Sequence, residues 1–259
     1  MKPSPASGTT GPPPARVDDE SRPGLVKETW CVELAFLVPA VLVAIDQFAA
    51  HLGGVGTIRQ FPSILHGHLV ANLILGVASY LSVGAVVPLA LLLLARTGQG
   101  PAALGLTTPR WRDLLPGIGI AAASYVAVAV ISLPLRMLAA HHRQLFAQLS
   151  AGQVPAYYLV FGLAVAAVTA VTEEILVNGY LITRLEQLGW LRSRALLLSM
   201  VLRTSYHVYY GLGFLFTIPF GYYAARSFQK HHRLTRPILA HFVYDATILT
   251  ITLLAAQHG

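Results

Sequence analysis

Long apolar runs constrain this chain more than any other feature of its sequence. Several of the runs reach the roughly 20 residues that a helix needs to cross a bilayer. Charged residues make up only 11% of the chain, whereas soluble domains contain about 25%. Seven apolar segments can be delimited, at about residues 30–50, 65–94, 114–135, 155–183, 195–210, 212–225 and 237–256.

These runs predict an all-α protein, a transmembrane bundle of about seven (seven to eight) helices. In lipid, every backbone polar group must be satisfied within its own helix or in a closed barrel. The runs lack the alternation of apolar and polar residues that barrel strands show. We expect a membrane domain over residues 30–259. Residues 1–29 are polar and rich in Pro, Gly and Ser, so we expect them to form a disordered cytoplasmic tail.

The basic residues predict how the chain is oriented. Of the 18 Lys and Arg residues, 14 fall on the inner side if the N-terminus is cytoplasmic, three fall on the outer side, and Arg203 lies within a segment. Inner loops of multi-pass proteins carry such an excess. We therefore expect an integral protein of the inner or plasma membrane with a cytoplasmic N-terminus. Because these loops account for the net charge of +7, we expect no nucleic-acid partner.

Five carboxylates fall inside the apolar segments, at Glu33, Asp46, Glu173, Glu174 and Asp245. A charge at the bilayer centre costs about 2.5–3.5 kcal/mol even on the scale with the smallest values. Glu33 and Asp46 lie toward the two ends of the first segment, where we expect them to reach water or help to pack helices. Glu173 and Glu174 lie deep within their segment, so a functional site explains them better.

The two adjacent glutamates are expected to face different neighbours, because successive side chains on a helix project about 100° apart. One could face a cavity while the other is held by a partner. Two carboxylates this close cannot both ionise at low cost. A glutamate that readily takes up a proton is suited to act as a general base or acid.

Two further polar pairs follow on later segments. Arg203 and His207 are four residues apart, as are His241 and Asp245, so each pair is expected to share one face of a helix. A buried arginine needs a carboxylate partner, and Glu174 is the best candidate for Arg203. The carboxylate of the second pair is expected to fix the tautomer of its histidine.

These three groups resemble the motifs of the CAAX-protease and bacteriocin-processing family of intramembrane endopeptidases, to which type II CAAX prenyl endopeptidase is related. That family carries Glu-Glu-x-x-x-Arg, Phe-x-x-x-His and His-x-x-x-Asn/Asp on successive membrane helices. The chain reads EEILVNG from Glu173, RTSYH from Arg203 and HFVYD from His241. The resemblance covers roughly residues 100–250 and implies an intramembrane protease with its active site in the C-terminal helices.

The chain departs from the family pattern at two positions. Asn178 stands where the family has arginine, and Arg203 stands where it has phenylalanine. We hypothesise that the departures are linked. Arg203 would then supply, from a neighbouring helix, the cation that normally comes from position 178, and it would pair with Glu174. These three residues would form a supporting group beside the catalytic residues.

The resemblance also implies catalytic roles. Glu173 would act as general base on a water molecule that His207 helps to hold. His241, oriented by Asp245, would stabilise the tetrahedral oxyanion. We prefer a metal-free reaction with no cofactor. The alternative is a zinc site formed by Glu173, His207 and His241, with a fourth position for water.

Two other classes of protein remain open at this point. A non-catalytic membrane scaffold or immunity-type protein is compatible with the two departures. A proton-coupled transporter would also place Glu, His and Asp within helices, although the sequence shows no internal repeat. As partners we expect membrane lipid and a peptide or membrane-anchored protein substrate. The sequence does not distinguish a prenylated substrate from an unmodified one.

Overall fold

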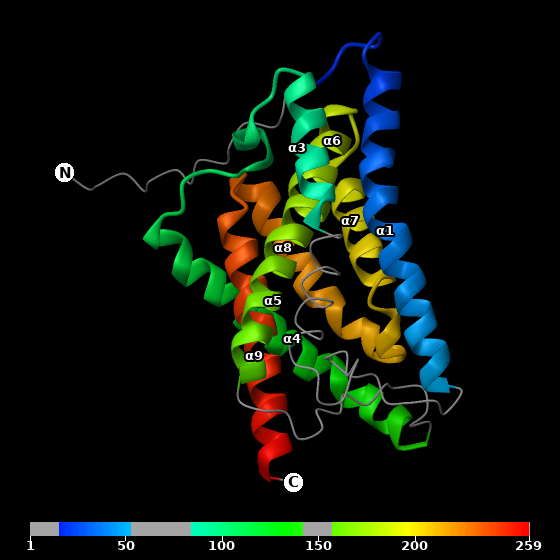
Figure 1. Cartoon of the computed structure of the whole chain (residues 1–259), viewed down its shortest axis with the longest axis vertical. Helices are drawn as coiled ribbons and strands as arrows, with labels where there is room; N and C mark the ends of the chain where they lie inside the picture. Colours follow the sequence, from blue (N-terminus) through cyan, green and yellow to red (C-terminus); the bar gives the residue numbers. More distant parts are fainter. Residues whose placement is uncertain (1–15, 53–83, 142–156, 259) are drawn as a thin grey trace, which may run out of the picture.

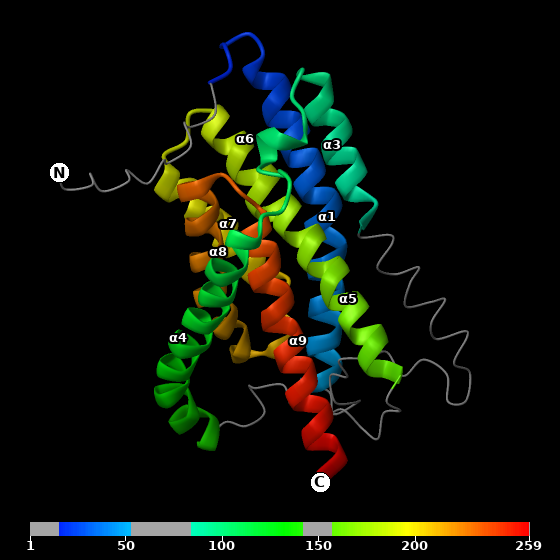
Figure 2. The ribbon, with the colours of Figure 1, turned by 90° about the vertical axis from the view of Figure 1, so that its left-hand side faces the viewer.

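The computed structural model describes residues 16–52, 84–141 and 157–258, and the regular elements in these ranges are helical. The predicted all-α class is therefore confirmed for this part of the chain. Most helices run roughly along the long axis of the molecule, and α4 lies on the outside of the group (Figures 1 and 2).

The helices can be grouped by length. The longer ones are α1 (Arg22–Leu52), α3 (Val86–Arg96), α4 (Leu114–His141), α7 (Arg192–Ser205), α8 (Thr217–His231) and α9 (Thr235–His258). One continuous helical rod joins α5 (Tyr157–Glu173), the π-helical segment η4 (Glu174–Tyr180) and α6 (Leu181–Gln187). Short 3-10 helices lie in the connections, namely η1 (Pro101–Leu104), η2 (Trp111–Asp113), η5 (Val208–Tyr210) and η6 (Leu212–Phe216). With the rod counted once, the described ranges hold seven longer helices, which is compatible with the predicted number.

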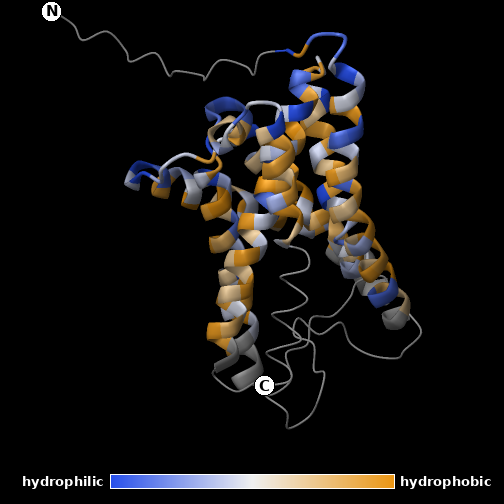
Figure 3. Cartoon of the chain, turned by 45° about the horizontal axis from the view of Figure 1, so that its top comes forward, coloured by the Kyte–Doolittle hydropathy of each residue, from blue (hydrophilic) through white to orange (hydrophobic). Residues whose placement is uncertain are grey.

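Three of the helical stretches are long and apolar enough to cross a membrane by length and composition, at residues 22–49, 111–135 and 159–187. Hydrophobic residues cover most of the helical surface, while hydrophilic residues gather toward the end of the molecule where α1 begins (Figure 3). These features indicate an integral membrane protein.

Some predicted boundaries are wrong. Helix α1 begins at Arg22, so the polar residues before Trp30 are already helical and the tail cannot extend to residue 29. Residues 1–15 of that tail lie outside the described ranges, as does most of the predicted segment at 65–94. The predicted segment at 195–210 is shorter than expected, because α7 ends at Ser205 and gives way to 3-10 turns.

The loops that were predicted to share the inner side lie at one end of the molecule. The start of α1 and the loops after α3, α6 and α8 meet there (Figure 1). Arg22 donates a hydrogen bond to the carbonyl of Leu188 at 3.2 Å, which joins the start of α1 to the end of α6. The buried carboxylate of Asp113 binds Arg233 at 2.6 Å and Arg236 at 3.0 Å. These contacts fix the start of α4 to the start of α9.

The main apolar core lies between α1, α3 and the rod. Its fully buried members include Val32, Ala90, Leu94, Leu104, Leu176, Tyr180, Leu181 and Ile182. Helix α9 packs against both α4 and α5. The middle of the rod is thus held from several sides, and the first predicted motif lies in this part of the rod.

Candidate active site

The first motif lies where the rod changes from an α-helix to a π-helix. Glu173 ends α5, and η4 begins with Glu174. Every residue of η4 is buried. A Cβ at position 179 would lie 2.7 Å from Leu234 Cδ1 and 3.3 Å from the carbonyl oxygen of Leu104, so Gly179 allows a close approach to both neighbours. Segments of π-helix are rare and often mark functional sites.

Glu174 has no solvent exposure and is held by three donors from three elements. Its Oε1 accepts from Arg203 Nη2 at 2.6 Å and faces His241 Nδ1 at 2.9 Å. Its Oε2 accepts from the Asn178 amide at 2.5 Å. A buried carboxylate is tolerated when it is paired and hydrogen-bonded in this way. The predicted pairing of Glu174 with Arg203 is therefore present.

Glu173 is the more accessible of the two glutamates, with 8% of its surface exposed. Its Oε2 accepts a hydrogen bond from Tyr206 Oη at 2.7 Å and another from Arg203 Nη1 at 3.3 Å. Arg203 thus contacts both glutamates, so the expectation that they face different neighbours is wrong in this respect. The π-helix turns less per residue than an α-helix, and the two terminal nitrogens of one guanidinium reach both carboxylates.

The two departures from the family pattern meet at Glu174. Arg203 is almost fully buried, and its guanidinium carbon also lies 5.3 Å from the centre of the Phe220 ring. The side chain of Asn178 is held in turn, because its Oδ1 accepts from Ser199 Oγ at 3.0 Å. A neutral amide therefore occupies the position of the family's arginine, and the cation comes from α7. This geometry supports the hypothesis that the two departures are linked.

His207 lies two residues beyond the end of α7. The expectation that it shares a helix face with Arg203 is wrong, since the helix has ended before it. Instead its Nδ1 lies 2.9 Å from the carbonyl oxygen of Arg203. A carbonyl oxygen can only accept, so Nδ1 carries the proton and Nε2 is left as an acceptor. The ring packs against Tyr206, with the two ring centres 4.7 Å apart.

His241 and Asp245 lie one turn apart on α9, as predicted, with 3.4 Å between His241 Nε2 and Asp245 Oδ2. The other ring nitrogen of His241 faces Glu174. Because a carboxylate only accepts hydrogen bonds when ionised, this arrangement favours a doubly protonated, positively charged ring. About a third of the Asp245 side chain is exposed, whereas His241, Glu174 and Arg203 are buried.

The predicted zinc ligands are not arranged as a metal site. Within the described ranges, no group of three His, Cys, Asp or Glu side chains could hold a metal ion. His241 directs both ring nitrogens toward carboxylates, and His207 uses Nδ1 on a backbone carbonyl. In this arrangement the residues do not fit zinc.

All seven residues singled out from the sequence join one network of contacts, and Tyr206 joins them as an unexpected member. Its hydroxyl is bonded to Glu173, and its ring also meets Phe36 of α1 edge-on at 5.5 Å. Tyr206, Tyr209 and Tyr210 form one aromatic run in the sequence. Nothing in the pattern separates the tyrosine that binds the glutamate from the others.

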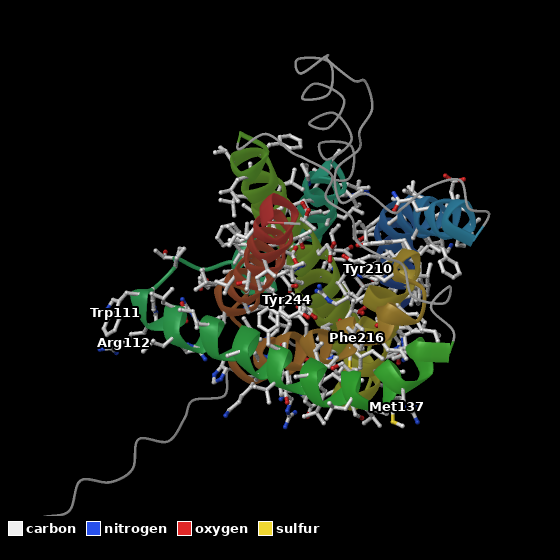
Figure 4. The ribbon with its side chains drawn as sticks, turned by 90° about the horizontal axis from the view of Figure 1, so that it is seen from below. Trp111, Arg112, Met137, Tyr210, Phe216 and Tyr244 are labelled. Carbon is white, nitrogen blue, oxygen red and sulfur yellow. The ribbon has the colours of Figure 1, made fainter. Side chains whose placement is uncertain are left out.

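Aromatic residues also lie on the side of the network near Asp245. Tyr125 of α4 donates to the carbonyl of Tyr244 at 2.7 Å, and the two rings stack 4.4 Å apart. Tyr210, Phe216 and Tyr244 lie near the middle of the helix group when it is seen from below, whereas Trp111, Arg112 and Met137 lie toward the two ends of α4 (Figure 4). The stacked rings of Tyr125 and Tyr244 therefore join the outer helix α4 to α9 beside the network.

The two carboxylates of α1 that were singled out from the sequence, Glu33 and Asp46, differ in burial. Asp46 is exposed on α1, in keeping with its expected access to water. Glu33 is completely buried, so of its two expected roles the access to solvent is wrong and the role in helix packing remains. It lies apart from the network of the three motifs, on the side of α1 that faces the core.

The comparison with known families bears on this group of residues. Residues 155–247 match the family described as type II CAAX prenyl endopeptidase, Rce1-like. The matched range contains all three motifs, and the resemblance inferred from them is confirmed for this part of the chain. No curated protein and no solved structure matches the chain.

Proposed function

We propose that this chain, whose residues 155–247 belong to the Rce1-like family of type II CAAX prenyl endopeptidases, is an intramembrane endopeptidase. It would hydrolyse a peptide bond near the terminus of a membrane-associated protein or peptide. The observation that carries this proposal is the network around Glu173. One oxygen of that carboxylate is fixed by Tyr206 and Arg203, which leaves Oε1 to accept a proton from water.

Charged groups of both signs surround Glu173 in this network. Three carboxylates, Glu173, Glu174 and Asp245, are grouped with two cations, Arg203 and His241. The group therefore carries one negative charge in excess when every carboxylate is ionised. Most of the group is buried, and charges interact strongly in a medium of low dielectric, so the two cations hold the three carboxylates in place.

The proposed reaction uses a single water molecule. Glu173 Oε1 takes a proton from the water, with Nε2 of His207 accepting a hydrogen bond from it, and the water oxygen attacks the peptide carbonyl carbon. The resulting oxyanion is stabilised by the positive charge of His241. Its contact with Asp245 is long at 3.4 Å, so the Nε2 proton is available to the oxyanion. Glu173 then gives its proton to the leaving nitrogen as the peptide bond breaks, and the products are a carboxylic acid and an amine, between which the remaining proton transfers to give a carboxylate and an ammonium group.

The other residues hold this arrangement in place. Glu174 anchors Arg203 and His241 through Oε1, and Asn178 holds its second oxygen. Asp245 limits the rotation of His241 from the other side. In this proposal none of these groups exchanges a proton with substrate. They keep the cations where the transition-state charge develops.

We further propose that the helices form a bundle in the inner or plasma membrane. The three apolar stretches that are long enough to span a bilayer support this placement. The start of α1 and the basic loops gathered at the same end would face the cytoplasm. Substrate would then come from protein or peptide ends anchored in that leaflet, and the name of the matching family points to prenylated C-termini as the first class to examine.

Purified protein in lipid vesicles tests the proposal. The substrate would be a fluorogenic peptide with a farnesylated CAAX terminus, and the variants would be Glu173→Gln and His207→Ala. Asp46→Asn is the matched control, because it removes an exposed carboxylate from an apolar helix outside the network. We expect wild type and Asp46→Asn to cleave the peptide. Loss of the base is expected to reduce the rate about 10²–10⁴-fold. Equal cleavage by Glu173→Gln would exclude the proposed mechanism, and no cleavage by wild type would favour the scaffold hypothesis.

The metal-free reaction is tested in the same preparation. Zinc content would be measured in the purified protein, and a chelator would be added to the cleavage assay. We expect substoichiometric zinc and an unchanged rate. One zinc per chain together with chelator-sensitive cleavage would show that the residues rearrange to bind metal.

A further inference from the structure

Glu33 presents a physical problem that the catalytic network does not solve. It lies on α1 with no solvent exposure. Neither carboxylate oxygen has a hydrogen-bond partner in the described part of the chain. An unbonded buried polar group costs about 1–3 kcal/mol, and an isolated buried charge costs far more. Such a group requires an explanation, because nearly all buried polar groups in native proteins are hydrogen-bonded to protein or to ordered water.

A second unsatisfied group lies nearby on the rod. The hydroxyl of Tyr180 is buried and has no hydrogen-bond partner within the described ranges. Tyr180 is close enough to Glu33 and to Glu28 for electrostatic interactions with both. Figures 1 and 2 show α1, α3 and α6 side by side in this region. Two elements therefore direct unsatisfied oxygen atoms into one buried place.

Arg184 lies beside Tyr180 and interacts with it electrostatically, but it makes no hydrogen bond to the carboxylate of Glu33. Its guanidinium carbon lies over the Tyr180 ring, 5.2 Å from the ring centre. Its Nη1 donates to Gln187 at 2.9 Å and approaches Thr97 and Gln99 at 3.4 and 3.5 Å. The cation is thus turned toward the loop after α3. Its Nε is buried and lacks a partner among the described residues, which adds a donor to the unsatisfied set.

We propose that water is bound at this place, between α1 and the rod, with Glu33 and Tyr180 as its main ligands. A buried water typically makes two to four hydrogen bonds to otherwise unsatisfied polar groups. Glu33 supplies acceptors, Tyr180 supplies a donor and an acceptor, and Arg184 Nε supplies a further donor. Tyr180 is the last residue of η4, the segment that begins with Glu174. The bound water therefore links α1 to the segment that carries the first motif.

Water-dependent hydroxyl-radical labelling tests this directly in the wild-type protein. Brief X-ray pulses generate radicals from bound water, so a buried side chain is oxidised quickly only if water lies next to it. Tyr180 and Leu94 are both completely buried, and Leu94 serves as the dry reference after correction for intrinsic reactivity. We expect Tyr180 to be labelled severalfold faster than Leu94. Equal labelling would overturn the proposal without any variant being made.

A variant identifies the ligand. In Glu33→Leu the polar ligand is replaced by an apolar side chain, and we expect labelling of Tyr180 to fall to the level of Leu94. The half-exposed Tyr222 is the internal standard that should not change. Unchanged labelling of Tyr180 would show that Glu33 does not hold the water. Neither measurement uses peptide cleavage, so the outcome is independent of the proposed function.

Discussion

Two completely buried glutamates lie in helices of this protein, and their surroundings are opposite. Glu174 is held by Arg203, His241 and Asn178, whereas Glu33 has no hydrogen-bond partner in the described ranges. The same side chain is thus fixed by protein in one region and, as we propose, by water in the other. Burial alone therefore does not show what a carboxylate does in this protein. The donors around it decide how much the fold depends on its charge.

The largest loss of stability and activity is expected at Arg203, the arginine that binds Glu174. Arg203→Ala would leave Glu174 buried without its closest cation and Glu173 without one of its donors. Removing one partner of a buried ion pair costs about 3–5 kcal/mol, so we expect a large loss of unfolding free energy and loss of peptide cleavage. Denaturant titration in detergent micelles measures the first, and the farnesylated peptide assay measures the second.

Arg194→Ala is the matched control, because it removes an exposed arginine from the same helix. It should change neither stability nor cleavage appreciably, since exposed charges contribute little. If Arg203→Ala were as mild as this control, the ion network would not be the feature that stabilises the first motif.

An intermediate effect is expected at Asp113. This carboxylate is also buried, but its partners Arg233 and Arg236 keep 14% and 20% of their side chains exposed. If the carboxylate is lost, water can therefore solvate part of the charge of Arg233 and Arg236. We expect Asp113→Asn to cost about 2 kcal/mol, below the range for fully buried pairs. The same titration measures this loss, and cleavage by the folded fraction should persist, because Asp113 pairs with Arg233 and Arg236 rather than with the motif residues.

A smaller effect is expected at Asn178. Asn178→Ala removes one donor from Glu174, while Arg203 and His241 still compensate its charge. A hydrogen bond to a charged group contributes about 1.5–3 kcal/mol, so the loss should lie near the lower end of that range, well below the effect of Arg203→Ala. A comparison of the two unfolding free energies under one set of conditions measures the difference. A larger loss for Asn178→Ala would mean that the amide, rather than the arginine, anchors the motif.

The smallest effect is expected at Glu33. Glu33→Gln keeps the shape and can still bind water, so we expect less than about 1 kcal/mol of change in unfolding free energy. The identical substitution Glu174→Gln should be far more damaging, because it leaves two cations without their carboxylate. Equal losses of unfolding free energy in these two variants would show that the fold depends equally on the charges of Glu33 and Glu174, against our expectation.

Much of the fold could be predicted from the sequence because lipid leaves few alternatives for a long apolar run. The helices at 114–135 and 237–256 were placed within a few residues of α4 and α9, apart from the extra turns at their ends. The start of α1 was not predicted, since residues 22–29 are polar and local composition there resembles a tail. Their helical state depends on contacts that composition does not report, such as that of Arg22 with Leu188.

The site could be predicted as a set of residues but not as a geometry. Residue spacing predicted the pair of His241 with Asp245, and the cost of a buried cation predicted the pair of Arg203 with Glu174. The π-helix was not predicted, because the apolar run at residues 155–183 has no feature that separates a π-helix from an α-helix. For the same reason the sharing of one arginine by both glutamates was missed. Tyr206 lies directly after the end of α7 and donates to Glu173. The apolar pattern predicted that the helix continues to residue 210, so this contact could not be foreseen.

The central claim is that Arg203 has taken over the role of the arginine that the family carries at the position of Asn178. The most direct test restores the family pattern in this chain. Arg203→Phe alone should lose stability and cleavage of the farnesylated peptide. The double variant Arg203→Phe/Asn178→Arg should recover both to a large extent, because the cation again reaches Glu174. Full activity of Arg203→Phe alone, or a double variant no better than the single one, would contradict the account.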